Sequence, residues 1–253
     1  MQYLKDFLDN KANKYNQPDF IELDPISIPH KFSRKEDIEI AGFLAATLAW
    51  GNRKSILKSL NQLMIFMDNA PYDFVINSID KELEHLNEFK YRTFNGTDCK
   101  FFIKSLQNIY KTHDGLETVF TNGFKKSQTI KNTIVSAKNI FFSINHPERT
   151  TKHLSNPNIG SAAKRINMFL RWMVRDDKNG VDFGLWKNIP SNKLMIPLDV
   201  HSGTIARNLG LLNRKQNDWK AVEELTNVLK EFDAHDPIKY DFALFGVGVN
   251  KDY

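Results

Sequence analysis

Residues 160–175 combine a helical apolar pattern with four cations and no acidic residue. At 3.6 residues per turn, one face collects the residues suited to a core, which are Ala163, Ile166, Leu170 and Met173. Another face collects the polar residues, which are Lys164, Asn167, Arg171 and Arg175. The pattern predicts a helix that packs on one side and presents a basic surface on the other.

Helical patterns account for most of the remaining chain. Residues 38–50 form a nearly continuous apolar run after a capping box at Ser33 and Glu36, which predicts a buried helix. Asp199 and Asp218 stand where helix N-caps are expected. No segment alternates with a period of two, so the predicted fold class is all-α with many helices.

Composition narrows the classes of function. No apolar run is long enough to cross a membrane, and residues 1–6 lack the pattern of a secretory signal, so we expect a cytoplasmic protein and no membrane partner. The single Cys99 excludes an internal disulfide and a four-cysteine cluster. The scattered histidines show no ligand spacing, so we expect no metal and no cofactor, and we expect a monomer.

Positive charge is concentrated in one part of the chain. Residues 118–175 hold ten Lys or Arg against the single acid Glu148, a net +9, although the whole chain carries only +5. The remainder is therefore −4. Such segregation is typical of a surface that binds a polyanion, with a solvated basic face as the alternative.

Two stretches together resemble the helix-hairpin-helix base-excision DNA glycosylases, and most closely the archaeal 8-oxoguanine glycosylases. The first is Gly160-Ser-x-x-Lys164 before a helix, and the second is Pro197-Leu-Asp199-Val-His201 followed by Arg207 and Gly210. The whole chain also resembles an uncharacterised, mainly bacterial family that shares the segments at 49–53, 171–175 and 236–245. Only Gly160 of the usual Gly-x-Gly hairpin pair is present.

The resemblance implies one glycosylase-like unit over residues 1–253. It consists of a helical lobe at about 33–126 with residues 1–32 packed on it, a hairpin-containing lobe at about 127–235, and a helix at 236–248 that closes the cleft. The hairpin and its surroundings would contact the DNA backbone through Arg53, Gly160, Ser161, Arg165, Arg171, Arg175 and His201.

The resemblance also implies the catalytic pair. Lys164 would attack C1′ of the damaged nucleotide and form a Schiff base, which requires an uncharged amine. Asp199 would supply negative charge beside the developing cation and handle the proton of the amine. The alternatives are that Lys164 is one more solvated cation and that Asp199 is only a helix cap.

A flipped base needs an aromatic partner and polar groups at its edge. The candidates for this base pocket are Trp50, Asn52, Trp172, Asp241 and Phe245. Asp241 resembles the acid that contacts the N–H groups of the base in the archaeal enzymes. Alternatively, the aromatic residues belong to the core and Asp241 pairs with a lysine such as Lys239.

Two hypotheses of function follow. The first is a DNA glycosylase with lyase activity that acts on duplex DNA with an oxidised purine, and the resemblance implies 8-oxoguanine as that purine. The second is a non-catalytic helical protein that binds DNA or RNA and retains the fold, which the reduced hairpin motif favours. A small-molecule enzyme with a phosphate-bearing substrate is a third alternative.

Overall fold

The computed structural model describes residues 2–250 and 252, and over these residues the chain is all-α, as the sequence predicts. The exception is a pair of two-residue strands, β1 (Lys90–Tyr91) and β2 (Phe94–Asn95), which pair antiparallel with Tyr91 opposite Phe94. The chain divides into two compact units, unit 1 (Met1–Glu22 and Ser155–Tyr253) and unit 2 (Leu23–Leu154).

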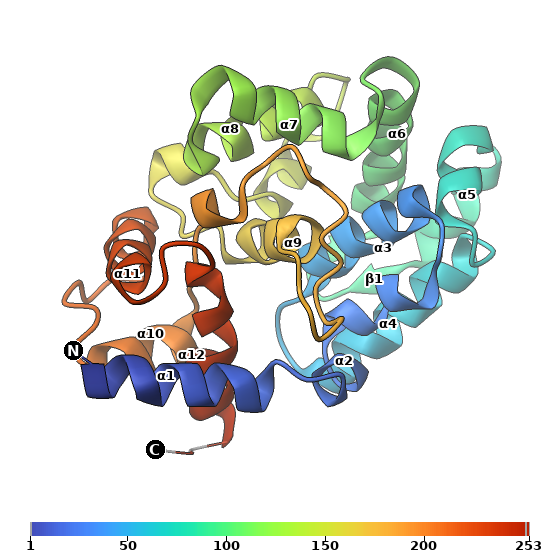
Figure 1. Cartoon of the computed structure of the whole chain (residues 1–253). Helices are drawn as coiled ribbons and strands as arrows, with labels where there is room; N and C mark the ends of the chain where they lie inside the picture. The colour runs from blue at the N-terminus through green and yellow to red at the C-terminus, as the bar shows by residue number, and fades with distance from the viewer. Residues whose placement is uncertain (1, 251, 253) are drawn as a thin grey trace. The chain divides into compact units, whose positions relative to one another are not determined.

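Unit 2 contains the helices that lie between residues 25 and 153 (Figure 1). Its α-helices are α3 (Lys35–Leu48), α4 (Arg53–Phe66), α5 (Pro71–Asn77), α6 (Gly96–Thr112), α7 (Gly115–Ser127) and α8 (Ile130–Phe141). Its 3-10 helices are η1 (Pro25–Ser27), η2 (Pro29–Lys31), η3 (Glu82–Glu88) and η4 (Glu148–His153). The core of unit 2 is aromatic, with ring contacts among Phe43, Phe94, Phe102 and Phe141.

Helix α3 is the predicted buried helix of unit 2. Every residue from Ile38 to Leu48 is buried, which explains the nearly continuous apolar run. The predicted capping box at Ser33 and Glu36 is wrong. The N-cap is Arg34, which offers no side-chain cap, and the Glu36 carboxylate pairs with the Arg34 guanidinium at 3.3 Å instead.

Unit 1 contains both ends of the described chain. Its α-helices are α1 (Gln2–Tyr15), α2 (Asp19–Glu22), α9 (Lys164–Val174), α10 (Val200–Asn208), α11 (Trp219–Phe232) and α12 (Tyr240–Asn250). Its 3-10 helices are η5 (Pro157–Ile159), η6 (Ser191–Lys193) and η7 (Pro237–Lys239). Helix α12 packs against both α1 and α10, as Figure 1 shows.

The predicted lobe boundaries differ from these units. The boundary lies between residues 154 and 155, rather than near residue 126, and residues 1–22 group with the C-terminal part of the chain. Helix α1 is held there because Tyr15 packs so closely under Gly246 that any side chain at 246 would collide with its ring. Tyr240 also donates a hydrogen bond to Asp9 of α1 at 2.9 Å.

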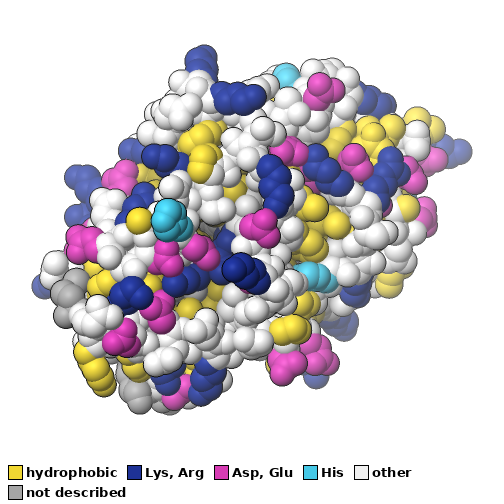
Figure 2. All heavy atoms as spheres, viewed as in Figure 1, with side chains coloured by type: hydrophobic (Ala, Val, Ile, Leu, Met, Phe, Trp, Pro, Cys, Tyr) yellow, Lys and Arg dark blue, Asp and Glu magenta, His cyan; other side chains and the backbone are white. Residues whose placement is uncertain are grey.

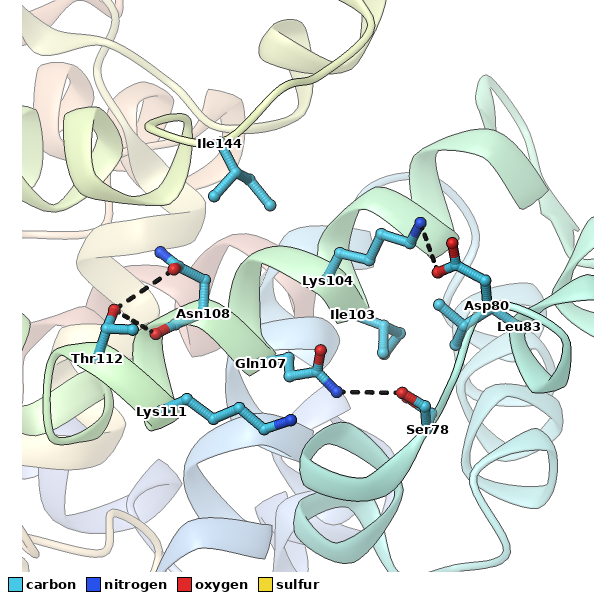
Figure 3. A pocket seen from close by; sticks show the side chains of 10 residues that line it. All are labelled: Ser78, Asp80, Leu83, Ile103, Lys104, Gln107, Asn108, Lys111, Thr112 and Ile144. Atoms are coloured by element: carbon cyan, nitrogen blue, oxygen red, sulfur yellow. Dashed lines mark hydrogen bonds and ion pairs between the residues drawn. The ribbon is translucent and has the colours of Figure 1, made fainter.

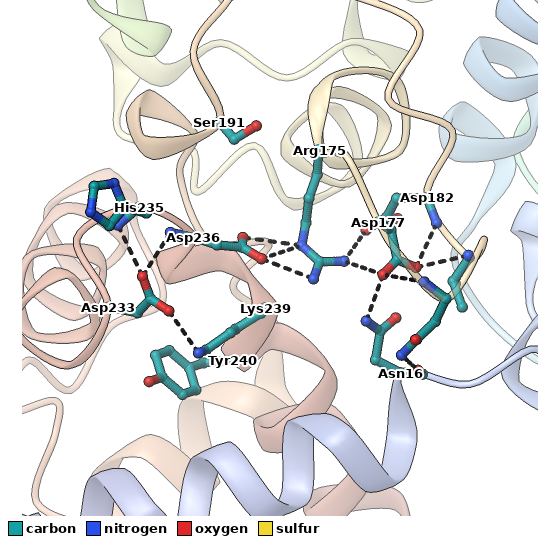
Figure 4. Close-up of polar contacts among 12 residues, drawn as sticks. Asn16, Arg175, Asp177, Asp182, Ser191, Asp233, His235, Asp236, Lys239 and Tyr240 are labelled. Atoms are coloured by element: carbon teal, nitrogen blue, oxygen red, sulfur yellow. Dashed lines mark hydrogen bonds and ion pairs between the residues drawn. The ribbon is translucent and has the colours of Figure 1, made fainter.

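Two buried arginines connect α9 to other segments of unit 1. Arg171 is 3% exposed, and its Nε donates to Asp182 at 3.1 Å while an Nη donates to Asp241. Arg175 is 4% exposed, and it contacts Asp182 at 2.9 Å and Asp236 at 2.9 Å (Figure 4). The Asp182 carboxylate therefore bridges two guanidinium groups.

This burial corrects one prediction. Leu170 and Met173 are buried as predicted, but Arg171 and Arg175 do not lie on an exposed basic face, and their prediction as DNA-backbone contacts is wrong. The acids that neutralise them follow α9 in the chain, in the 176–182 loop and around α12. No pattern within residues 160–175 indicates those partners.

Replacing Asp182 by asparagine tests how much unit 1 depends on this bridge. The asparagine would keep the shape but remove the buried carboxylate that both guanidiniums contact, so we expect the free energy of unfolding to fall by about 3 to 5 kcal/mol. Urea denaturation measures the change. The matched control is Asp176→Asn in the same loop, where an exposed pair with Lys187 predicts a change within about 0.5 kcal/mol. Equal effects of the two substitutions would contradict a special role for Asp182.

Candidate active site

Lys164 and Asp199, the predicted catalytic pair, lie next to each other at the starts of two helices of unit 1. Lys164 is the first residue of α9, and Asp199 is the N-cap of α10. The Lys164 Nζ lies 3.7 Å from the Asp199 Oδ2. At this distance the two charges attract, but the amine is not held in a hydrogen bond. Both side chains are partly exposed, at 27% and 23%, so a ligand has access to them.

The two carboxylate oxygens of Asp199 have different neighbours. Oδ1 accepts a hydrogen bond from the backbone N–H of Ser202 at 3.0 Å, which confirms the predicted helix cap. The Asp199 N–H in turn donates to the Ser202 hydroxyl at 3.0 Å, completing a capping box. Oδ2 is the oxygen that faces Lys164. The cap therefore fixes the carboxylate while leaving one oxygen for chemistry.

Asp241 of α12 is a second acidic group at this site. Its predicted alternative partner, Lys239, pairs with Asp9 and Asp233 instead, and Asp241 contacts Arg171. Burial raises the pKa of the Asp241 carboxyl to about 6; the positive charges of Arg171 and Lys164 oppose this rise, and the negative charge of Asp199 adds to it. Asp241 thus interacts electrostatically with both members of the catalytic pair.

The turn before α9 contains two residues in the left-handed conformation. Gly160 is left-handed with φ +89°, and Ala163, the N-cap of α9, is also left-handed with φ +49°. Ala163 has no side chain that can cap the helix, so the first amides of α9 receive no side-chain acceptor from it. The Gly160 carbonyl accepts from the Trp219 N–H at 3.0 Å, which ties the turn to the start of α11.

The other residues predicted near the hairpin, Ser161, Arg165 and His201, differ in their exposure and contacts. The Ser161 hydroxyl accepts from the Ala163 N–H at 3.2 Å, so the Ala163 amide is taken up inside the turn. Burial lowers the pKa of Arg165. His201, in the first turn of α10, is exposed.

The two aromatic candidates of unit 1, Trp172 and Phe245, differ in their exposure. Trp172 is fully buried, and its prediction as part of a base pocket is wrong because no part of its ring is accessible to a ligand. It occupies a core position in α9, where the helix is buried on all sides from Asn167 to Val174. Phe245 is half-buried and makes an edge contact with Phe20 at 6.3 Å between centroids.

Unit 2 holds the remaining candidates around the end of α3. Trp50 is half-buried, and Asn52 is exposed and caps α4 by accepting from the Ser55 N–H at 3.2 Å. Arg53, the first residue of α4, is partly exposed. The sequence did not indicate Arg92, whose guanidinium lies 4.5 Å from the centre of the Trp50 ring.

The described residues offer neither a metal site nor a membrane-spanning helix. No group of three or more His, Cys, Asp or Glu within residues 2–250 and 252 could hold a metal ion. None of the helices described combines the length and apolar character that a membrane crossing requires.

On the face shown in Figure 2, Lys and Arg side chains lie scattered among acidic ones. Unit 2 also contains a pocket of about 330 Å³, drawn in Figure 3, which no predicted site residue lines.

Comparisons with known proteins identify one family. A family model with the description "Protein of unknown function (DUF2400)" matches residues 24–250. No curated protein and no solved structure matches the chain. The match includes every candidate site residue named above.

The pKa of Asp241 predicts a pH dependence of stability. Its folded value of about 6 exceeds the ordinary value of about 3.9, so between these pH values the folded protein holds a proton that the unfolded chain releases. The free energy of unfolding therefore loses a contribution on the order of 2 to 3 kcal/mol as the pH rises from about 4 to above 6.

Replacing Asp241 by asparagine removes this titration. We expect the stability difference, parent minus variant, to decrease as the pH rises through this window and then to level off, as measured by urea denaturation at pH 4, 5, 6 and 7. The exposed Asp6→Asn is the control and should follow the parent at every pH. Parallel curves for the parent and Asp241→Asn would show that Asp241 titrates normally.

Proposed function

We propose that this chain, which belongs to the DUF2400 family, is a DNA glycosylase with lyase activity that removes an oxidised purine such as 8-oxoguanine from duplex DNA. The observation that carries the proposal is the 3.7 Å approach of Lys164 to Asp199. The two residues are 35 positions apart in the chain and start different helices. An amine and a fixed carboxylate, both accessible, are the groups that this reaction requires.

The reaction would proceed by displacement at C1′. The uncharged Lys164 amine forms a bond to C1′, the glycosidic C1′–N bond breaks, and the base leaves with the bonding electrons and takes up a proton. The nitrogen then loses a proton to Asp199 or solvent, and opening of the sugar ring gives the Schiff base. Loss of a C2′ proton from this intermediate expels the 3′-phosphate and cleaves the strand.

Asp199 would act through its Oδ2 atom. The transition state carries positive charge at the sugar, and a carboxylate held by its helix cap stabilises such charge without reorganising. Because Oδ1 is engaged by the Ser202 N–H, the carboxylate cannot turn away from Lys164 without breaking the cap. The structural and chemical roles of Asp199 are thus compatible.

Asp241 would contact the extruded base. With a pKa of about 6, its carboxyl accepts hydrogen bonds from N–H groups when ionised and donates one when protonated. Phe245 lies one helical turn further along α12, on the same face, and offers a partly exposed ring. These two residues supply the edge contact and the flat surface that a flipped purine needs within unit 1.

The DNA backbone would meet the turn before α9. Helix α9 begins at Lys164 without a side-chain cap from Ala163, and a phosphate is favoured at a helix N-terminus. Gly160 is exposed, and a side chain there would meet open space, so a phosphate can approach the backbone. His201 and Arg165 remain backbone contacts in this proposal, and Arg171 and Arg175 do not.

One observation favours the second candidate, a non-catalytic protein that binds DNA or RNA. The Ala163 N–H donates to the Ser161 hydroxyl and is not available to a phosphate, and the element before the turn is the short 3-10 helix η5. Such a turn offers fewer groups to a phosphate. A protein of this kind would bind DNA and release no base.

The proposal predicts a covalent intermediate at Lys164. Borohydride should reduce the Schiff base and trap a protein–DNA complex when the parent protein meets duplex DNA with 8-oxoguanine or an abasic site. Lys164→Gln removes the nucleophile and should abolish trapping. Lys220→Gln, an exposed lysine of α11, is the matched control and should trap like the parent. Trapping by the parent and by Lys164→Gln alike would reject Lys164, and binding without trapping or base release would support the second candidate.

Asp199→Asn separates the cap from the chemistry. Asn caps a helix about as well as Asp, so the melting temperature should stay within about 1–2 °C of the parent value. The negative charge is lost, so single-turnover base release should fall by about 100-fold or more. The control is Asp218→Asn, which removes the charge of the N-cap of α11 and should leave base release unchanged. Unchanged base release in Asp199→Asn would reduce Asp199 to a helix cap.

A further inference from the structure

Trp50 and Arg92 of unit 2 form a stacked pair. Trp50 follows the end of α3 and is half-buried, and Arg92 lies in the turn between β1 and β2 and is exposed. The Arg92 guanidinium lies 4.5 Å from the centre of the Trp50 ring. The indole Nε1 is buried without a hydrogen-bond partner, so a ligand would meet the carbon face of the ring rather than its N–H.

A second arginine of unit 2 shows what is unusual about this pair. Arg34 stacks on Tyr72 at 4.1 Å in the same way, but its charge is neutralised by Asp73 at 2.9 Å and by Glu36 at 3.3 Å. Arg92 has no carboxylate within ion-pair distance among residues 2–250 and 252. The charge of Arg92 is therefore available to an anion, whereas the charge of Arg34 is already neutralised by Glu36 and Asp73.

The backbone around the pair is held firmly, and the Arg92 side chain lies against Gly51 and the Tyr91 hydroxyl. The Tyr91 hydroxyl donates to the Trp50 carbonyl at 2.5 Å and fixes the end of α3 to β1. Arg149 donates to the Thr93 carbonyl at 3.0 Å and so anchors the turn from its other side. Arg92 itself adopts a left-handed φ of +53°, a conformation that a non-glycine residue keeps only when its surroundings enforce it.

We infer that Trp50 and Arg92 form a binding site for an unpaired nucleotide, with the base on the Trp50 ring and the phosphate on Arg92. A base and a guanidinium are both flat groups that stack on an indole, so the base would take the place that Arg92 occupies without ligand. The displaced Arg92 is long enough to turn toward the phosphate of the same nucleotide. There its guanidinium, which no carboxylate neutralises, would form an ion pair with the phosphate.

The inference rests on the proposed function for its choice of nucleic acid as the ligand. Its site, however, is built entirely from residues of unit 2, while Lys164, Asp199 and Asp241 belong to unit 1. Base stacking does not require the lysine chemistry. The two proposals can therefore fail separately.

Tryptophan fluorescence provides a selective readout. The other tryptophans, Trp172, Trp186 and Trp219, are at most 3% exposed, so stacking of a base can quench only Trp50. We expect single-stranded oligothymidylate to quench the emission, and an abasic oligomer of the same length, which has phosphates but no bases, to cause little quenching. Trp50→Phe should lose the quenching and keep the circular dichroism of the parent.

Substitution of the arginines tests the role of Arg92. Arg92→Ala should weaken oligothymidylate binding by roughly tenfold at low salt, and its log–log salt slope should be less steep by about 0.7, the value for one phosphate contact on a single strand. Arg34→Ala is the matched control and should leave both affinity and slope unchanged. Arg92 and Arg34 variants that bind alike, or equal quenching by the abasic oligomer, would overturn the inference.

The two proposals give distinguishable results in the unmodified protein. Quenching without borohydride trapping would contradict the glycosylase proposal and leave the stacking site intact. Trapping without quenching would contradict the stacking site alone.

Discussion

Asp182 lies between two buried guanidinium groups, and the position of α9 in unit 1 depends on it. A buried arginine without a carboxylate partner is costly. Two arginines one helical turn apart, Arg171 in α9 and Arg175 at its C-cap, are buried. Their other acids are Asp177 in the loop after α9, Asp236 just before η7, and Asp241 in α12. Helix α9 can therefore be buried only where these segments supply the opposing charge. Lys164 at the start of α9 takes its place beside Asp199 as a consequence.

Burial is the main reason that the pKa of Asp241 is raised, and the negative charge of Asp182 in the same network adds to the rise. The carboxylates of Asp177, Asp182, Asp236 and Asp241 surround the guanidiniums of Arg171 and Arg175. Four acids thus share two cations, and Asp241 must share Arg171 with Asp182. A carboxyl in this position is stable with or without its proton near neutral pH, which is the property expected of a group that contacts a base by hydrogen bonds.

Features with local sequence signals were predictable, and features that depend on distant partners were not. The caps at Asp199 and Asp218 were predicted correctly because a cap involves residues only three positions away. The burial of Arg171 was missed because its acids lie 11 and 70 residues further along the chain. The left-handed conformation of Arg92 was also missed, since arginine does not favour it and the clamp by Arg149 is distant. Within the site, the approach of Lys164 to Asp199 followed a family resemblance rather than any spacing rule.

The chain order of the units has a consequence for synthesis on the ribosome. Unit 2 is a continuous insert between the two segments of unit 1, and α1 finds its packing partner only when α12 has been made. Because domains generally fold as they emerge, unit 2 has all of its residues early enough to fold first. Helix α1 must wait until α12 has been translated, with its apolar side uncovered. A folded unit 2 would then shorten the effective loop between α1 and the rest of unit 1 and lower the entropy lost in closing it.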